Sequence, residues 1–279
     1  MMKNTVYVIK KLMLLGVILM AVNLTSVKAQ GLNFGNGNSD VPIEVYADNG
    51  IEWQQETLTF LAKGNARAIR GEVNVFGDEL RAFYRELSVG GTEIWRLDVN
   101  GNVKIVTPGE TAYGDHGVYD VDNAILVLTG KRVRLLTPTD EVIADQQIEY
   151  WERKQMAVAR GNAQVLSDDK NLRAEVIVAY FQENNFGKSV VHRVEAFDNV
   201  NIKTSKEEAT SDRGVYNVKS GIATLTGSVK ITQDQNKLEG CKAEFNMNSG
   251  VSRMFSCENS AGGQVGGSFK INSKTKKKN

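Results

Sequence analysis

Histidine is scarce in this chain and is not placed for metal binding or acid–base chemistry. The 279 residues contain two histidines, His116 and His192. Neither belongs to a metal-ligand spacing such as HxxxH or HExxH. The chain also lacks the GxSxG, Walker and dinucleotide-binding glycine patterns. We therefore expect both histidines to lie on the surface, and we predict no enzymatic activity, no metal site and no cofactor.

Four aspartates recur in the sequence at a fixed distance, and carboxylate pairs are a common basis of acid–base catalysis. Each of them stands beside a glycine-containing or polar turn, where an aspartate commonly bonds its own backbone. A structural role is therefore the better prediction for all four. They pair 97 residues apart as Asp48 with Asp145 and Asp115 with Asp212.

Two cysteines, Cys241 and Cys257, flank the sequence NSG at residues 248–250, which suits a hairpin loop. A loop centred on Ser249 would place the two cysteines opposite one another, where a disulfide is geometrically feasible. In an exported protein such a bond would persist. Two free thiols remain the alternative.

The first 29 residues predict a secretory signal peptide. Lys3, Lys10 and Lys11 precede an apolar run at residues 12–22, and small residues lead to Ala29. An uncleaved membrane anchor is the alternative, although Asn23 interrupts the run before the roughly 20 apolar residues that a span needs. Of the 34 Lys and Arg residues, four lie in this segment and five after residue 269, which leaves 25 against 33 acidic residues between them. This acidic body argues against nucleic-acid binding.

The sequence repeats itself with an offset of 97 residues. GDHGVYDVDNAILVLTG at 114–130 returns as SDRGVYNVKSGIATLTG at 211–227. We predict a flexible lead at 30–40 and one domain at 41–257. This domain would contain two copies at about 44–140 and 141–237 and part of a third, followed by a disordered Gly-rich and Lys-rich tail at 258–279. Regular repetition indicates a stacked architecture.

The repeated units are predicted to be β-strands. TLTGSVKI at 224–231 alternates apolar and polar residues around a glycine turn. LRAEVIVAYF at 172–181 is an apolar run rich in β-branched residues. An all-β fold with little helix follows, in which stacked hairpins enclose an apolar trough and leave unpaired sheet edges at both ends.

These segments, in this order, resemble the OstA-like family. The resemblance rests on PIEVYADNGIEW, VNGNVKIVT, SDRGVYNVKSGIATLTGSVKI and AEFNMNSGVSRM. It implies an elongated β-jellyroll of antiparallel strands with an apolar interior open at both ends. It further implies a periplasmic protein that binds the lipid A acyl chains of lipopolysaccharide and passes lipopolysaccharide from the inner to the outer membrane.

The resemblance also implies partners. An LptC-like inner-membrane protein would pair with the N-terminal edge, for which Ile43 and Val45 are candidates. An LptD-like outer-membrane protein would pair with the C-terminal edge, at Phe245, Met247 and Val251. Head-to-tail copies of the chain are another expected assembly.

The trough-lining candidates are apolar strand positions, most of them matched between the copies. They are Ile51, Leu80, Val103, Ile105, Leu128, Ile148, Ile177, Val200, Ile202, Leu225, Val229 and Ile231. Two other functions stay open: an anchored LptC-like component of the same pathway, and a structural surface β-solenoid that binds no lipid.

Overall fold

A computed structural model describes residues 42–257, except 89, 169, 186–188 and 250, and also residues 265–268. Eighteen β-strands and one short 3₁₀ helix, η1 (Glu152–Lys154), make up this part of the chain. The predicted all-β fold is confirmed. The strands are β1 (Glu44–Tyr46), β2 (Ile51–Gln54), β3 (Thr59–Arg70), β4 (Val73–Glu86), β5 (Thr92–Val106), β6 (Thr111–Asp120), β7 (Ile125–Thr129), β8 (Val133–Leu136), β9 (Asp140–Ala144), β10 (Gln147–Trp151), β11 (Met156–Ser167), β12 (Lys170–Glu183), β13 (Ser189–Lys203), β14 (Glu207–Asn217), β15 (Ile222–Gln233), β16 (Asn236–Asn246), β17 (Val251–Phe255) and β18 (Gly266–Ser268).

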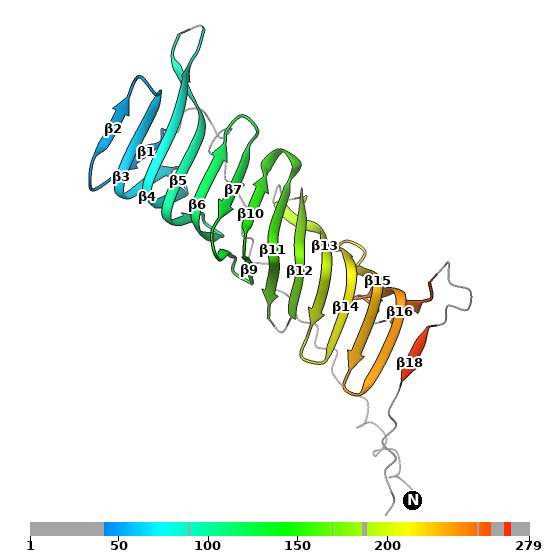
Figure 1. Cartoon of the computed structure of the whole chain (residues 1–279). Coiled ribbons are helices and arrows are strands. Elements are labelled where there is room, and N and C mark those ends of the chain that lie inside the picture. Colours follow the sequence, from blue (N-terminus) through cyan, green and yellow to red (C-terminus); the bar gives the residue numbers. More distant parts are fainter. Residues whose placement is uncertain are drawn as a thin grey trace, which may run out of the picture.

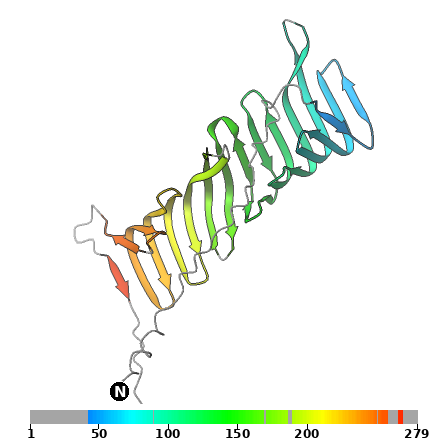
Figure 2. The same ribbon diagram turned by 180° about the vertical axis from the view of Figure 1, so that it is seen from behind.

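The strands follow one another along an elongated, twisted stack (Figure 1, and from behind in Figure 2). All pairings are antiparallel, and most join strands that are neighbours in the sequence. Each long strand pairs in two stretches with a register shift between them, as between Lys63 and Ala66 of β3. Such bulges bend a strand. Each long strand therefore contributes to two limbs, which we call limb 1 (the β2, β7, β10 and β17 side) and limb 2 (the β1, β8, β9 and β18 side).

The bends of β3, β5, β11, β13 and β15 contain residues that adopt a left-handed backbone. Gly64 and Asn65 have φ of 78° and 43°, and Gly161 and Asn162 have φ of 81° and 45°. Glycine and asparagine are the residues that tolerate this conformation best. At Gly227 of β15, with φ of 98°, an added Cβ would also collide with the carboxylate of Asp212 in the preceding strand, β14.

The two halves of the molecule are built alike. Strands β3, β4 and β5 begin and end 97 residues before β11, β12 and β13. The residues of β15 form one continuous strand, whereas the residues 97 positions earlier are divided between β7 and β8. The β9 and β10 pair is divided in the same way, so the middle of the stack consists of four short strands.

The space between the limbs is lined by small and aliphatic side chains that follow one another from strand to strand. One such row runs through Leu80, Val99, Gly117 and Leu128, which are successive register partners. Buried residues of β4 to β13 form one apolar cluster, and a second one occupies β14 to β16. None of the helices in the described ranges is long and apolar enough to cross a membrane.

Two expectations for the C-terminal region are wrong. Gly266–Ser268, within the tail predicted to be disordered, forms β18 and pairs with β16. The hairpin of β16 and β17 pairs Asn246 with Val251, whereas a loop centred on Ser249 would pair Asn246 with Ser252, so the register differs from the expected one by one residue. The connection holds four residues rather than three, so the cysteines are offset. They are nevertheless joined in a disulfide with a Cα–Cα distance of 5.0 Å. The expected leader and flexible lead at 1–40 lie outside the described residues.

Candidate functional site

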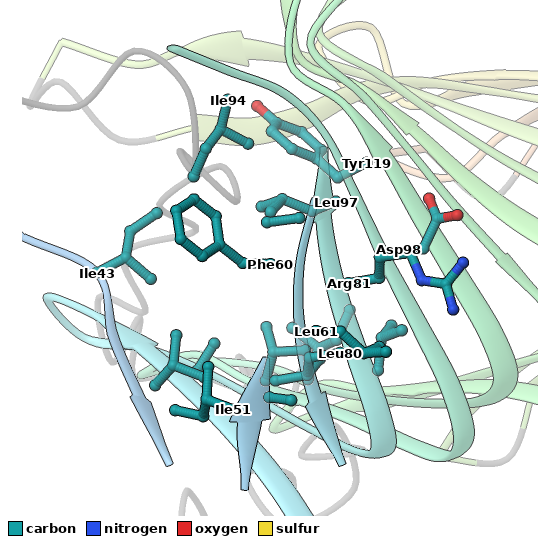
Figure 3. Close-up of a pocket in the computed structure, with 18 of the residues that line it drawn as sticks. Ile43, Ile51, Phe60, Leu61, Leu80, Arg81, Ile94, Leu97, Asp98 and Tyr119 are labelled. Atoms are coloured by element: carbon teal, nitrogen blue, oxygen red, sulfur yellow. The ribbon is translucent and has the colours of Figure 1, made fainter. Parts of the chain in front are cut away.

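An apolar pocket lies between the two limbs at the N-terminal end of the stack. Its volume is about 380 Å³, and strands β1 to β7 provide its walls. Ile43, Phe60, Ile94, Leu97 and Tyr119 lie around it in Figure 3. Apolar pockets of roughly 300–1,000 Å³ are typical ligand sites.

The charged residues beside the pocket direct their charges elsewhere. Arg81 and Asp98 lie on neighbouring strands, and their charged groups extend away from the other labelled side chains (Figure 3). Arg81 pairs with Glu79 at 3.1 Å, and Asp98 with Arg96 at 2.6 Å. The pocket therefore offers a ligand an almost purely apolar surface.

An aromatic group stands where the pocket meets the N-terminal edge of the sheet. The indole of Trp53 is stacked on Phe60 with ring centroids 5.6 Å apart, and its Nε1 donates to the Tyr84 hydroxyl at 2.8 Å. The Phe60 ring in turn lies 5.0 Å from that of Tyr84. Trp53 is still 61% exposed. This exposure leaves a large apolar surface available to a ligand or a partner.

The Tyr119 side chain, which lines the inner end of the pocket, contacts a group of partly buried polar residues outside the lining. The Tyr119 hydroxyl donates to Glu152 Oε1 at 3.3 Å. Burial raises the pKa of Glu152 to about 7, although the hydrogen bond from Tyr119 and the positive charge of Arg153 both lower it. Burial also raises the pKa of Glu110, and it raises that of Tyr150 to about 12 together with the nearby Glu152 and Glu110 carboxylates.

The predicted trough residues fall into two groups. Ile51, Leu80 and Ile105 line the pocket, although Ile51 is 53% exposed because β2 is the outermost strand of its limb. The others lie in the closed apolar clusters beyond the pocket: Val103, Leu128, Ile148, Ile177, Val200, Ile202, Leu225, Val229 and Ile231.

The predicted edge residues lie at the two ends of the stack. Ile43 and Val45 line the pocket in addition to being close to the N-terminal edge. Met247 and Val251 are 61% and 49% exposed at the other end, whereas Phe245 packs partly against the C-terminal apolar cluster.

The recurring aspartates connect neighbouring strands at the bends. Asp115 accepts a hydrogen bond from the Lys131 backbone at 3.0 Å, and Asp212 accepts one from the Ser228 backbone at 3.1 Å. These bonds reach the β7–β8 connection and strand β15, respectively, rather than the aspartate's own turn. Asp48 and Asp145 accept from asparagine side chains instead.

The histidines lie apart from one another and from the pocket. His116 contacts Asn100 at 3.0 Å on the exposed face, and the His192 ring is stacked on Tyr180. Within the described ranges, no three His, Cys, Asp or Glu residues come together in a way that could hold a metal ion.

Several pocket residues were missed by the sequence analysis. Phe60, Leu97 and Tyr119 were not proposed. The selection relied on apolar residues matched between the copies, which excludes Phe60 because its counterpart is Ala157, whereas Leu97 and Tyr119 are matched by Val194 and Tyr216 and were overlooked. A signal was nevertheless present, since alternation places Phe60 on the same strand face as Ala62. The strand register, which aligns Leu97 with Tyr119, supplies the rest.

The outer face of the sheet carries ion pairs. Glu195 accepts from Arg193 and Arg213, at 2.5 and 2.7 Å. Glu149 is paired with Arg160 at 2.5 Å. Burial alone would raise the pKa of Glu149, but hydrogen bonds from Arg160, Trp151 and Gln147 hold it below its ordinary value. The two faces of limb 1 therefore differ sharply in polarity.

Comparison with known proteins finds a curated relative and a solved structure that are similar to parts of this chain. An uncharacterized protein of Rhizobium meliloti (strain 1021) is 27% identical over 115 residues, which is 40% of this chain. The match spans 60% of the length of that relative. Among solved structures, LptH, the LptA homologous periplasmic component of the lipopolysaccharide transport device of Pseudomonas aeruginosa, is similar with a TM-score of 0.41 and 17% identity. That similarity covers 47% of this chain and 95% of LptH.

The family described as LptA/(LptD N-terminal domain) LPS transport protein matches residues 44–150 and 141–251. Together these two matches cover about three quarters of the 279 residues. The chain therefore belongs to the LptA/LptD N-terminal domain family of lipopolysaccharide transport proteins.

Proposed function

We propose that this protein is a periplasmic carrier that holds the acyl chains of lipopolysaccharide between its limbs and passes lipopolysaccharide from the inner to the outer membrane. The observation that carries the proposal is the apolar pocket of about 380 Å³ at one end of a stack that belongs to a lipopolysaccharide transport family. The carrier catalyses no reaction of its own in this proposal.

The chemistry of the pocket suits an acyl chain. Its labelled lining consists mainly of aliphatic and aromatic side chains, and its neighbouring charges point away (Figure 3). Burial of each methylene group contributes about 0.8 kcal/mol. Apolar contacts are not directional, so the pocket can bind such a chain at any position along its length. This suits a ligand that must later be released.

The ends of the stack support partner binding by strand addition. Edge strands present unpaired backbone groups that can accept another strand. Apolar side chains remain exposed at both ends, among them Trp53 and Ile51 of β2 and Val251 and Phe255 of β17. In our proposal an LptC-like protein docks at the N-terminal edge and an LptD-like protein at the C-terminal edge. A second copy could join head to tail through the same two edges.

The leader decides between a bridge and an anchored component. Cleavage after Ala29 would release a periplasmic bridge, whereas retention of the apolar segment at 12–22 would give an LptC-like anchored role. Mass determination of the exported N-terminus separates the two: a chain that begins near Gln30 supports the bridge, and an intact leader contradicts it.

Photocrosslinking tests the carrier function itself. A photoreactive amino acid would replace Phe60 or Ile105 in the pocket, with the exposed Lys219 as the matched control. After irradiation of cells, we expect lipopolysaccharide adducts at the two pocket positions and none at Lys219. Absence of adducts at all positions in folded, exported protein would contradict the proposal and favour a structural β-solenoid.

A further inference from the structure

Tyr119 forms part of the inner end of the apolar pocket. It lies on β6, is 3% exposed, and pairs in register with Leu97 on one side and Leu126 on the other. All three residues line the pocket, and Leu126 belongs to β7, the pocket strand furthest from the N-terminal edge. A chain that enters from that edge therefore meets this row last.

The Tyr119 ring is held by a residue from another element. Glu152 of η1 accepts the hydrogen bond from the Tyr119 hydroxyl at 3.3 Å. Tyr150, two residues earlier on β10, pairs in register with Leu126 and makes an edge contact with Phe181 at 6.2 Å between ring centroids. Tyr150 also packs against the apolar cluster that continues beyond the pocket strands.

The polarity of this end opposes further entry. The Tyr119 hydroxyl donates to the partly buried Glu152 carboxyl at the edge of the pocket, and breaking this hydrogen bond without replacing it is unfavourable. A methyl terminus offers no replacement hydrogen bond. The wall should therefore stay closed when an apolar chain reaches it.

Resting on the carrier function proposed above, we propose that Tyr119, positioned by Glu152, limits how far an acyl chain enters the pocket and so sets the chain length that the pocket accepts. The pocket volume of about 380 Å³ accommodates about thirteen methylene groups, if each takes about 30 Å³, the volume of a water molecule in the liquid. The accepted ligand is then a saturated chain of about 12 to 16 carbons.

Competition binding with saturated fatty acids of 8 to 18 carbons against a fluorescent fatty acid tests this length limit. For the purified wild-type protein, affinity should rise about fourfold per methylene and level off near 14 carbons. In Tyr119→Ala the plateau should move to chains longer by roughly three carbons, because a side-chain volume on the order of 100 Å³ is removed. Tyr216→Ala is the matched control, since Tyr216 lies 97 residues later on β14 and is not among the residues that line the pocket.

The role of Glu152 has its own readout. Glu152→Ala should move the plateau in the same direction as Tyr119→Ala, and Glu152→Gln, which retains an acceptor for the tyrosine, should restore the wild-type plateau. A merely structural role would lower affinity at all lengths without moving the plateau. If Tyr119→Ala does not fold, as judged by circular dichroism, Tyr119→Leu replaces it with a smaller shift expected.

The outcomes separate the two proposals. A plateau that stays at the wild-type length in folded Tyr119 variants would overturn the length limit and leave the carrier function standing. Failure of every variant and of the wild type to bind any fatty acid would overturn acyl binding in this pocket, and the length limit with it.

Discussion

Asn65 donates a hydrogen bond from its side-chain Nδ2 to Asp48 Oδ2, 2.7 Å away, across the bend where two neighbouring strands turn from one limb into the other. Asn162 and Asp145 repeat this bond at 3.1 Å, 97 residues later. In both places the aspartate N–H also donates to a glycine carbonyl of the next strand, at 2.8 Å. Polar side chains thus fix the bends without entering the apolar space between the limbs.

The bend bonds predict a measurable stability. Asp145→Ala removes the acceptor for Asn162, and the loss of one such bond should lower the free energy of unfolding by about 1 kcal/mol. For a domain of this size the melting temperature should fall by about 2 to 4 °C. Differential scanning calorimetry would measure it. Glu56→Ala, in an exposed turn, is the control, and equal effects of the two substitutions would contradict a role for the bend.

Matched core residues should contribute equally in the two halves. Leu128 and Leu225 are 97 residues apart and are 2% and 1% exposed. Truncation of either to alanine should reduce the free energy of unfolding by about 2 to 5 kcal/mol through lost burial and cavity formation. Urea titration of both variants gives the values. A change below about 0.5 kcal/mol at either site, the level expected of a surface substitution, would show that its interior is not tightly packed.

The disulfide should stabilise the C-terminal end. Cys241 and Cys257 are separated by 16 residues in sequence, and a bond that closes a loop of about this length contributes about 3 kcal/mol. We expect Cys241→Ser with Cys257→Ser to lower the unfolding free energy by about that amount. Hydrogen exchange should increase mainly in β17. Unchanged exchange in β17 would mean that its pairing with β16 suffices.

Glu152 should make stability depend on pH near neutrality. Its pKa is about 7 in the folded protein, above its ordinary value in an unfolded chain, so the folded state holds more protons between these two values. The contribution of Glu152 to the free energy of unfolding is therefore fully present at low pH and is lost as the pH rises through about 7. Glu152→Gln should remove this loss.

The measurement is the difference in melting temperature between Glu152→Gln and the wild type from pH 4.5 to 8. We expect this difference to shift in favour of the variant as the pH increases. Glu149 acts in the opposite sense, because its lowered pKa gives stability that is lost as the pH falls. A difference that is constant with pH would contradict the burial of the Glu152 carboxyl.

The sequence alone predicted the class of fold well, because that depends on patterns that repeat. Alternation in segments such as TLTGSVKI at 224–231 requires strands, and the buried residues of β15, Ala223, Leu225, Val229 and Ile231, are the alternating ones. The site was harder to predict. The sequence suggested one uniform trough, whereas the pocket lies at one end, where Phe60 lines it and the second copy has Ala157 instead.

The reason is physical. Register determines which side chains become neighbours across strands, and a shift of one residue changes the contacts throughout a strand. The loop between β16 and β17 illustrates this, since one extra residue displaced the cysteines from the expected alignment. Tyr119 and Glu152 show the same limitation, because they are distant in sequence and meet only through the stacking of β6, β7 and β10.

The four short strands in the middle of the stack have a mechanical consequence. β7 to β10 contain four or five residues each, whereas the long strands on either side contain 10 to 15. Short strands share fewer hydrogen bonds with their neighbours and resist bending less. We expect the two groups of long strands to be stiff and the section of β7 to β10 between them to bend more easily. The two ends of the molecule could then change direction relative to each other while the strand pairing stays intact.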